Sequence, residues 1–70
     1  MEKLRCYRQF RGLSRDELAH RAGISTETLA RYERGDREPN TTVIKRLALV
    51  LKCTPNELLG VNEKEGEDMN

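Results

Sequence analysis

The 70-residue sequence contains no tryptophan, one phenylalanine and two tyrosines, so its core cannot be built on aromatic side chains. Prolines and glycines are few, and no strand-like alternation of apolar and polar residues is present, which favours helices over strands. The sequence also has no apolar run near the roughly 18 residues that predict a membrane-spanning helix. No apolar segment follows Met1, so we expect neither membrane insertion nor export. A chain this short makes one domain, and its core must be aliphatic.

Cysteine is scarce too, and its spacing argues against a metal site. Cys6 and Cys53 lie 47 positions apart (53 − 6), no CxxC pair occurs, and His20 is the one histidine. These residues are too few and too scattered for a zinc site or a disulfide framework. We therefore expect two reduced thiols in a cytoplasmic protein, with no metal and no cofactor.

The residue sets that enzymes need are missing as well. Ser14 fits a helix cap, and His20 falls on a different helical face, so the sequence does not supply a nucleophile and its base. No glycine-rich phosphate loop and no paired-carboxylate site is present. We expect no enzymatic activity.

Charge is unevenly distributed along the chain. The formal net charge is +1, but residues 1–60 hold 12 Lys and Arg against 8 Asp and Glu, a net of +4 (12 − 8). The last ten residues, VNEKEGEDMN, hold four acids and one lysine. The basic excess suits an anionic partner. We expect residues 1–60 to form the domain and residues 61–70 to be an acidic, disordered tail.

Apolar spacing and helix-end signals predict five helices. Ser14 with Glu17, and Thr54 with Glu57, have the spacing of the capping box that begins a helix. Ser25 is a further N-cap, and four of the five helices should end at Gly12, Gly23, Gly35 or Gly60. The expected ranges are about 2–11, 15–22, 26–34, 42–51 and 55–59.

The second and third of these helices are joined by a very short turn. Only Gly23 and Ile24 stand between the end of one and the cap of the next, which forces the sharp crossing of a helix-turn-helix. Ala19 is small enough for the two helices to approach closely, and Ile24 and Leu29 can fill the angle between them.

The stretch LSRDELAHRAGISTETLARYERGDREPN resembles the helix-turn-helix of the Cro/cI-type (XRE-like) DNA-binding regulators. YERG and NELLG lie in register with the framework of that family, so that the resemblance covers about residues 3–60. It implies an all-α, compact five-helix domain with the lambda repressor-like DNA-binding fold. In that fold the third helix lies in the major groove of DNA.

By the same resemblance, three residues occupy base-facing positions: Thr26, Glu27 and Arg31. Arg31 has the geometry for a bidentate contact to guanine, Thr26 offers a methyl group to thymine, and Glu27 can accept from cytosine N4. The alternative for each is a solvated residue on an amphipathic helix. For Glu27 the alternative also includes a favourable charge at a helix N-terminus.

Phosphate contacts are expected beside these base contacts. Arg15 stands where family members usually carry a glutamine that meets the DNA backbone and braces the third helix, and Thr41 is a weaker candidate. The alternative for any one of them is again simple solvation. The full set of expected phosphate contacts is Arg15, Ser25, Thr28, Arg34, Arg37 and Asn40.

A structural role is expected for some of the remaining residues. Arg8 and Glu33 match positions that form a partly buried ion pair in several relatives, with a phosphate contact by Arg8 as the alternative. Tyr7 should belong to the core. Phe10 replaces a residue that is usually polar, and we expect it to pack against the domain rather than lie under the tail or a partner. His20 is assigned no function.

These features together predict a sequence-specific transcriptional regulator of double-stranded DNA, most simply a repressor that binds a palindromic operator as a homodimer. The dimer interface is expected at the fifth helix and Val61, with Val50 or Leu58 nearby. A cytoplasmic, nucleoid-associated protein of a prokaryote or phage fits this profile, and a toxin or anti-repressor is a possible protein partner. The alternative is a protein-interaction module on the same fold, such as an antitoxin or adaptor, whose third helix should expose apolar residues.

Overall fold

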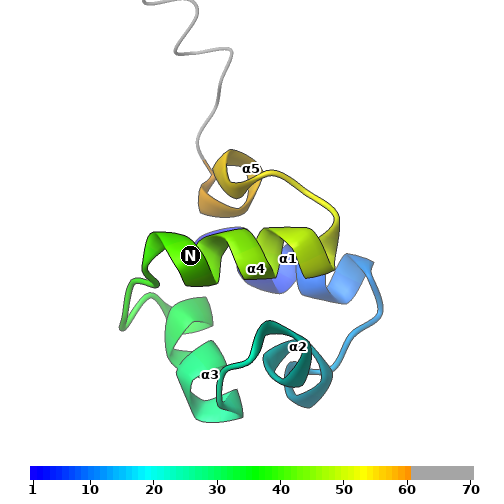
Figure 1. Ribbon diagram of the computed structural model, residues 1–70, viewed down its shortest axis with the longest axis vertical. Helices are drawn as coiled ribbons and strands as arrows, with labels where there is room; N and C mark the ends of the chain where they lie inside the picture. Colours follow the sequence, from blue (N-terminus) through cyan, green and yellow to red (C-terminus); the bar gives the residue numbers. More distant parts are fainter. Residues whose placement is uncertain (61–70) are drawn as a thin grey trace, which may run out of the picture.

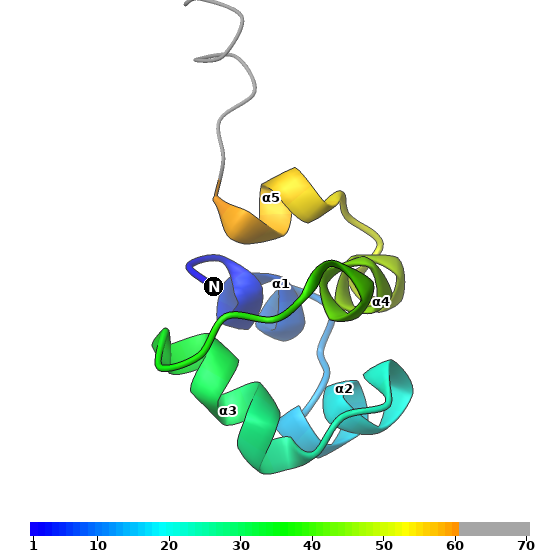
Figure 2. The same cartoon turned by 60° about the vertical axis from the view of Figure 1, so that its left-hand side comes forward.

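The structure is a computed structural model that describes residues 1–60, and it contains five helices and no strand in that range. The helices are α1 (Leu4–Phe10), α2 (Arg15–Ala22), α3 (Thr26–Arg34), α4 (Thr41–Leu51) and α5 (Pro55–Leu59). α1 and α4 lie in the middle of the molecule, with α2 and α3 on one side of them and α5 on the other (Figures 1 and 2). The predicted all-α, five-helix architecture is confirmed. The predicted acidic tail, residues 61–70, lies outside the described residues.

The ends of α2 and α3 are fixed by their own capping residues. Ser14 Oγ accepts from Glu17 N at 3.1 Å while Glu17 Oε1 accepts from Ser14 N at 3.1 Å, which is the predicted capping box. Ser25 Oγ accepts from Thr28 N at 3.1 Å and begins α3. Gly23 and Gly35 end the two helices at φ of 73° and 83°, a conformation that costs glycine little.

The start of α4 differs from the prediction, whereas its last residue, Leu51, is the expected one. Asn40 is its N-cap, because Asn40 Oδ1 accepts from Val43 N at 2.9 Å, so that the helix begins one residue earlier than expected. Its C-cap is Lys52, a non-glycine residue with φ of 56°. Arg11 then binds the last carbonyl groups, donating from Nε to Leu51 O at 2.8 Å and from Nη2 to Lys52 O at 3.2 Å. A cation here also complements the negative end of the helix dipole.

All five helices contribute to the core, which is aliphatic as predicted. Tyr32 is the one large aromatic residue among the buried side chains of residues 1–60. Leu58 is fully buried in this core, so its side chain is not available to the subunit interface expected at the fifth helix. The large side chains that are fully enclosed are Leu4, Leu18, Leu29, Leu47, Leu51 and Leu58.

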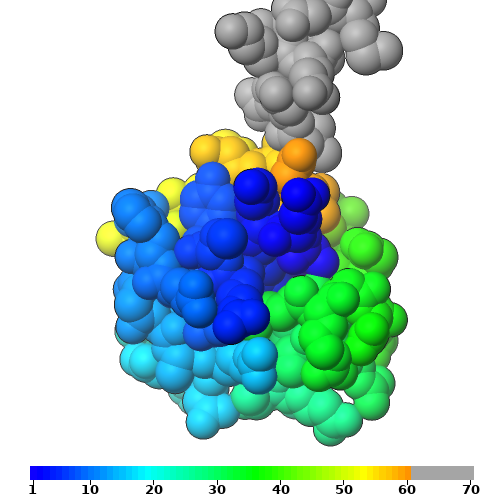
Figure 3. Space-filling view, turned by 180° about the vertical axis from the view of Figure 1, so that it is seen from behind, coloured from blue at the N-terminus to red at the C-terminus, as the bar shows by residue number. Residues whose placement is uncertain are grey.

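The expectation that Phe10 packs against the domain is wrong. Its side chain is 76% exposed, and the guanidinium carbon of Arg11 lies 5.1 Å from the ring centroid. Phe10 lines an open groove of about 380 Å³ with Lys3, Cys6 and Tyr7. α1, drawn in blue, occupies the face of the molecule seen in Figure 3. Tyr7 is half-buried, with its hydroxyl 3.5 Å from Glu57 Oε2.

No helix formed by residues 1–60 has the length and apolar character that crossing a membrane requires.

Candidate nucleic-acid interface

The turn between α2 and α3 fixes how α3 is presented. Ala19 and Ala22 are buried at 1% exposure, which lets the helices approach closely, and Ile24 N donates to Ala19 O at 3.0 Å. Leu29 and Tyr32 anchor the inner face of α3 in the core. α3 therefore lies at the edge of the molecule with its outer face turned away from the other helices (Figure 2).

The outer face of α3 is polar along its whole length. Thr26, Glu27, Arg31 and Arg34 are exposed, while Ala30 is half-buried. The exposed large apolar side chains among residues 1–60 are instead on α1 and α4. α3 thus presents hydrogen-bonding groups and charges to solvent rather than an apolar stripe.

Two of the residues predicted to meet bases bind each other in this structure. Arg31 Nη2 donates to Glu27 Oε1 at 3.0 Å, one helical turn apart, and both side chains are exposed. Such a pair contributes only about 0.3–0.5 kcal/mol to a helix, so it opens at little cost. Each of the two side chains can therefore leave the other and bind an external partner.

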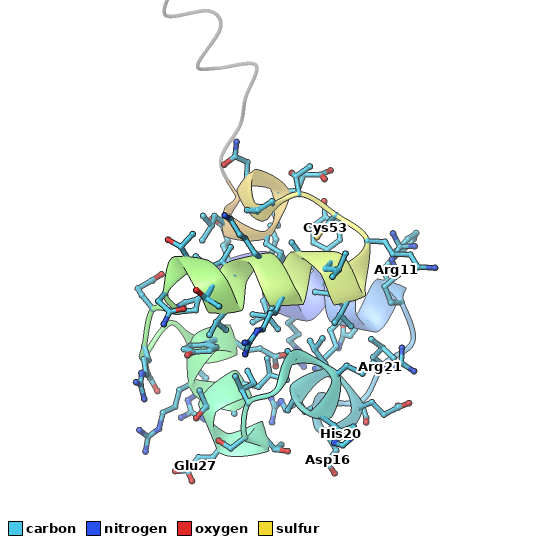
Figure 4. The ribbon with its side chains drawn as sticks, viewed as in Figure 1. Arg11, Asp16, His20, Arg21, Glu27 and Cys53 are labelled. Atoms are coloured by element: carbon cyan, nitrogen blue, oxygen red, sulfur yellow. The ribbon has the colours of Figure 1, made fainter. Side chains whose placement is uncertain are left out.

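The hydroxyl groups at the start of α3 are also engaged. Thr26 Oγ1 donates to Asp16 Oδ1 at 2.7 Å, which joins the first turn of α3 to the first turn of α2. Ser25 Oγ donates to Thr28 Oγ1 at 2.7 Å. Asp16 and Glu27 both point away from the helical body along the same edge of the molecule in Figure 4. Sequence reasoning missed Asp16, because an acid in the first turn of a helix is normally explained by the helix dipole alone.

Glu33 joins three helices behind this face. Its side chain is 2% exposed, and its Oε2 accepts from Arg8 Nε at 2.6 Å. Its Oε1 accepts from Arg15 Nε at 3.0 Å, and Arg8 Nη1 donates further to Leu13 O at 3.0 Å. Arg15, at 46% exposure, thus ties α2 to α3 where the family usually has glutamine, and its terminal nitrogen atoms make no hydrogen bond among residues 1–60.

The remaining predicted contacts gather at the other end of α3. Arg34 Nε donates to Asp36 Oδ2 at 2.8 Å, and both groups are exposed. Arg37 is exposed in the following loop. Asn40 uses its side-chain oxygen as the cap of α4, which leaves its amide nitrogen as the group that can meet a phosphate.

Other reactive side chains lie away from this set. His20 is exposed on α2, and Cys6 and Cys53 are free thiols on other elements. In the part of the chain that the structure describes, no three His, Cys, Asp or Glu side chains are grouped so that they could hold a metal ion.

Comparisons with known proteins agree with this geometry. The family model HTH_3, described as helix-turn-helix, matches residues 4–58. A Bacillus subtilis (strain 168) protein named "Uncharacterized HTH-type transcriptional regulator YazB" is 34% identical over 56 residues, which cover 80% of this chain and 81% of that protein. A Pyrobaculum aerophilum protein named "Putative HTH-type transcriptional regulatory protein PAE1627" is 46% identical over 62 residues, 89% of this chain but only 25% of that longer protein. No solved structure matches the chain. The chain belongs to the Cro/cI-type (XRE-like) family of helix-turn-helix DNA-binding transcriptional regulators.

Proposed function

We propose that this protein binds double-stranded DNA in a sequence-specific way and regulates transcription, most simply as a repressor that occludes a promoter. The observation that carries the proposal is the outer face of α3, which is polar and exposed and is anchored from behind by Leu29 and Tyr32. A helix held in this way can enter a major groove about 12 Å wide without rearrangement of the domain.

Base reading is assigned to three exposed side chains of α3, Thr26, Glu27 and Arg31. Arg31 can bind the O6 and N7 atoms of a guanine, and Glu27 can accept from the N4 amino group of a cytosine. Their mutual ion pair favours DNA that satisfies both groups at once, because a site that engages only Arg31 leaves a carboxylate facing DNA without its partner. Glu27 therefore supports discrimination between sequences rather than affinity.

Phosphate contacts are assigned to groups on both sides of that reading surface. On one side Arg15 donates to Glu33 through Nε, and this bond leaves both terminal nitrogen atoms of Arg15 able to donate to a phosphate. On the other side stand Arg34, Arg37 and the amide of Asn40. The hydroxyl of Thr28 accepts from Ser25 and keeps its own proton for a phosphate. Such contacts fix the orientation of the protein on the duplex and carry no sequence information.

The length of α3 argues for two subunits on one site. Nine residues make a helix about 13 Å long, which spans only four or five base pairs. A genome offers about a million or more competing sites, so a useful specificity requires a second copy on a second half-site. We therefore propose a homodimer on a palindromic operator whose half-sites are about 10 base pairs apart.

The competing role as a protein-interaction module is not favoured by α3. An antitoxin or adaptor that used this face for a protein partner should expose large apolar side chains on it. Phe10 and Leu49, the large apolar residues that are exposed within residues 1–60, lie on α1 and α4 instead.

Selection of binding sites from a random duplex library, at about physiological salt, tests the proposal. We expect an enriched palindrome, and we expect Arg31→Ala to relax the preference at one position of each half-site by about 1–3 kcal/mol. Arg37→Ala is the matched control, because loss of a phosphate contact should weaken binding equally for all sequences. Salt-sensitive binding without any enriched sequence would contradict base reading by α3.

A further inference from the structure

The start of α3 contains two exposed hydroxyl groups whose protons are both donated within the protein. Ser25 Oγ donates to Thr28 Oγ1, and Thr26 Oγ1 donates to Asp16 Oδ1, each at 2.7 Å. A threonine hydroxyl has a single proton, so Thr26 has no donor left for a base while it binds Asp16. The part of the Thr26 side chain that remains for an external contact is its methyl group.

We propose that Asp16, a residue of α2 and not of the recognition helix, determines the specificity of this interface by fixing which group Thr26 presents. This inference rests on the proposed function. A threonine side chain occupies a small number of staggered rotamers, and its branched Cβ places the methyl group and the hydroxyl in different directions. The bond to Asp16 holds Oγ1 against α2 and thereby fixes the rotamer of Thr26, which leaves the methyl group as the part of the side chain for an external contact.

A methyl group in the major groove recognises the 5-methyl group of thymine, which no other base carries. A hydroxyl at the same place hydrogen-bonds to more than one base edge and discriminates poorly. Asp16 thus converts Thr26 from a tolerant polar contact into an apolar contact that is selective for thymine.

The charge of Asp16 supports a role beyond helix stability. Within residues 1–60 the carboxylate of Asp16 forms no ion pair. It lies on the same edge of the molecule as the carboxylate of Glu27 (Figure 4). An unneutralised carboxylate beside the reading helix repels phosphates and lowers the affinity for every sequence. Asp16 therefore lowers the affinity for all DNA while it raises the selectivity for thymine.

The experiment compares operator duplexes in which single thymines are replaced by uracil, which lacks only the methyl group. The full-length protein should lose about fourfold in affinity at one thymine of each half-site, the value of one buried methyl group. Asp16→Ala should abolish this difference between thymine and uracil. Asp16→Asn keeps an oxygen that accepts from Thr26 and should retain the difference.

Further variants separate the effect of the negative charge of Asp16 from the effect of its hydrogen bond to Thr26. Asp16→Asn and Asp16→Ala should each raise the affinity for all duplexes by roughly two- to fivefold, because each removes one negative charge near several phosphates. Glu2→Gln removes the same charge beside Gly60, at the end of α5, and should change affinity less than about twofold. Thr26→Val keeps the methyl group and should retain the uracil effect, whereas Thr26→Ser should lose it.

The outcomes separate this inference from the proposed function. If the library yields no operator, the proposed function fails and the inference fails with it. If an operator is found but no thymine is sensitive to uracil, or if Asp16→Ala keeps the full uracil effect, the role of Asp16 is overturned while the regulator remains. Because Asp16 is exposed, each Asp16 variant should have a melting temperature close to that of the wild-type protein. This measurement is the control that every binding assay compares folded proteins.

Discussion

Replacing Glu33 with alanine should destabilise the domain far more than its position near the end of α3 suggests. The substitution removes a carboxylate at 2% exposure that accepts from Arg8 and from Arg15. Arg8, at 11% exposure, would keep only its bond to Leu13 O. An almost buried guanidinium would then lack its counter-charge.

The magnitude follows from the two ion pairs that are lost. Removing one partner of a buried ion pair costs about 3–5 kcal/mol, and an exposed pair such as that of Arg15 adds about 0–1 kcal/mol. Because Arg8 retains one hydrogen bond, we expect about 3 kcal/mol in total. A domain of this size has a free energy of unfolding of roughly 3.5–10 kcal/mol, so this loss is a large fraction of it. The melting temperature should fall by about 12–24 °C.

Thermal melting followed by circular dichroism measures this effect. Arg15→Ala is the control and should cost less than about 1 kcal/mol, because the Arg15 side chain is 46% exposed and its ion pair is screened by solvent. The double variant Arg8→Ala/Glu33→Ala should lose less than the sum of the single variants, because each single change already breaks the shared pair. The operator preference of Glu33→Ala should be unchanged at a temperature where it is folded. A fall in melting temperature of less than about 4 °C, or a large change of preference at unaltered stability, would refute this reasoning.

Three further predictions follow from local contacts. Asn40→Ala should cost about 1 kcal/mol by removing the cap of α4, whereas Asn40→Ser should melt like the wild-type protein and reveal in a DNA-binding assay whether the amide is needed. Hydrogen bonds from backbone N–H groups hold the pKa of Glu17 and of Glu57 below the usual value, so the stability that they contribute is complete above about pH 4.3 and is lost as the pH falls through the lowered pKa. The melting temperature of the Glu17→Gln/Glu57→Gln variant should fall less steeply with decreasing pH in that range. A slope equal to that of the wild-type protein would show that these two carboxylates are not the source of the pH dependence. Burial raises the pKa of the Cys53 thiol, so that an alkylating reagent at neutral pH should label exposed Cys6 first, and the reverse order by mass spectrometry would be inconsistent with the structure.

The parts of the fold that could be predicted from sequence are those that depend on neighbours along the chain. Ser14 with Glu17 and Thr54 with Glu57 form the expected capping boxes, because each needs only a spacing of three residues. The ends at Gly23 and Gly35 follow in the same way from the left-handed conformation that glycine adopts easily. The sharp turn after α2 could be predicted from the short connection between the two helices alone.

Features that depend on distant segments could not be predicted in this way. Arg11 satisfies carbonyl groups 40 and 41 positions along the chain, and nothing in its own helix indicates that role. The tendency of large apolar residues to be buried predicts packing for Phe10, yet no element formed by residues 1–60 covers its side chain where α1 ends. Among the site residues, the face that bears Thr26, Glu27 and Arg31 was visible from helical spacing.

The contacts made by those exposed residues were not visible in the sequence. The bond from Asp16 to Thr26 depends on the angle between two helices rather than on spacing in either. The bond from Arg15 to Glu33 has the same origin.

The attachment of α3 has a consequence for how such regulators diversify. The helix is secured by Ser25 and Gly35 at its ends and by Leu29 and Tyr32 on its inner face, and none of these four residues is assigned to read a base. Substitutions at exposed positions away from such features usually change stability by no more than about 0.5 kcal/mol. Mutation of the outer face can therefore explore new target sequences while the scaffold stays intact. A duplicated copy of the gene can acquire a separate operator, and with it an independent circuit, through a handful of nucleotide changes.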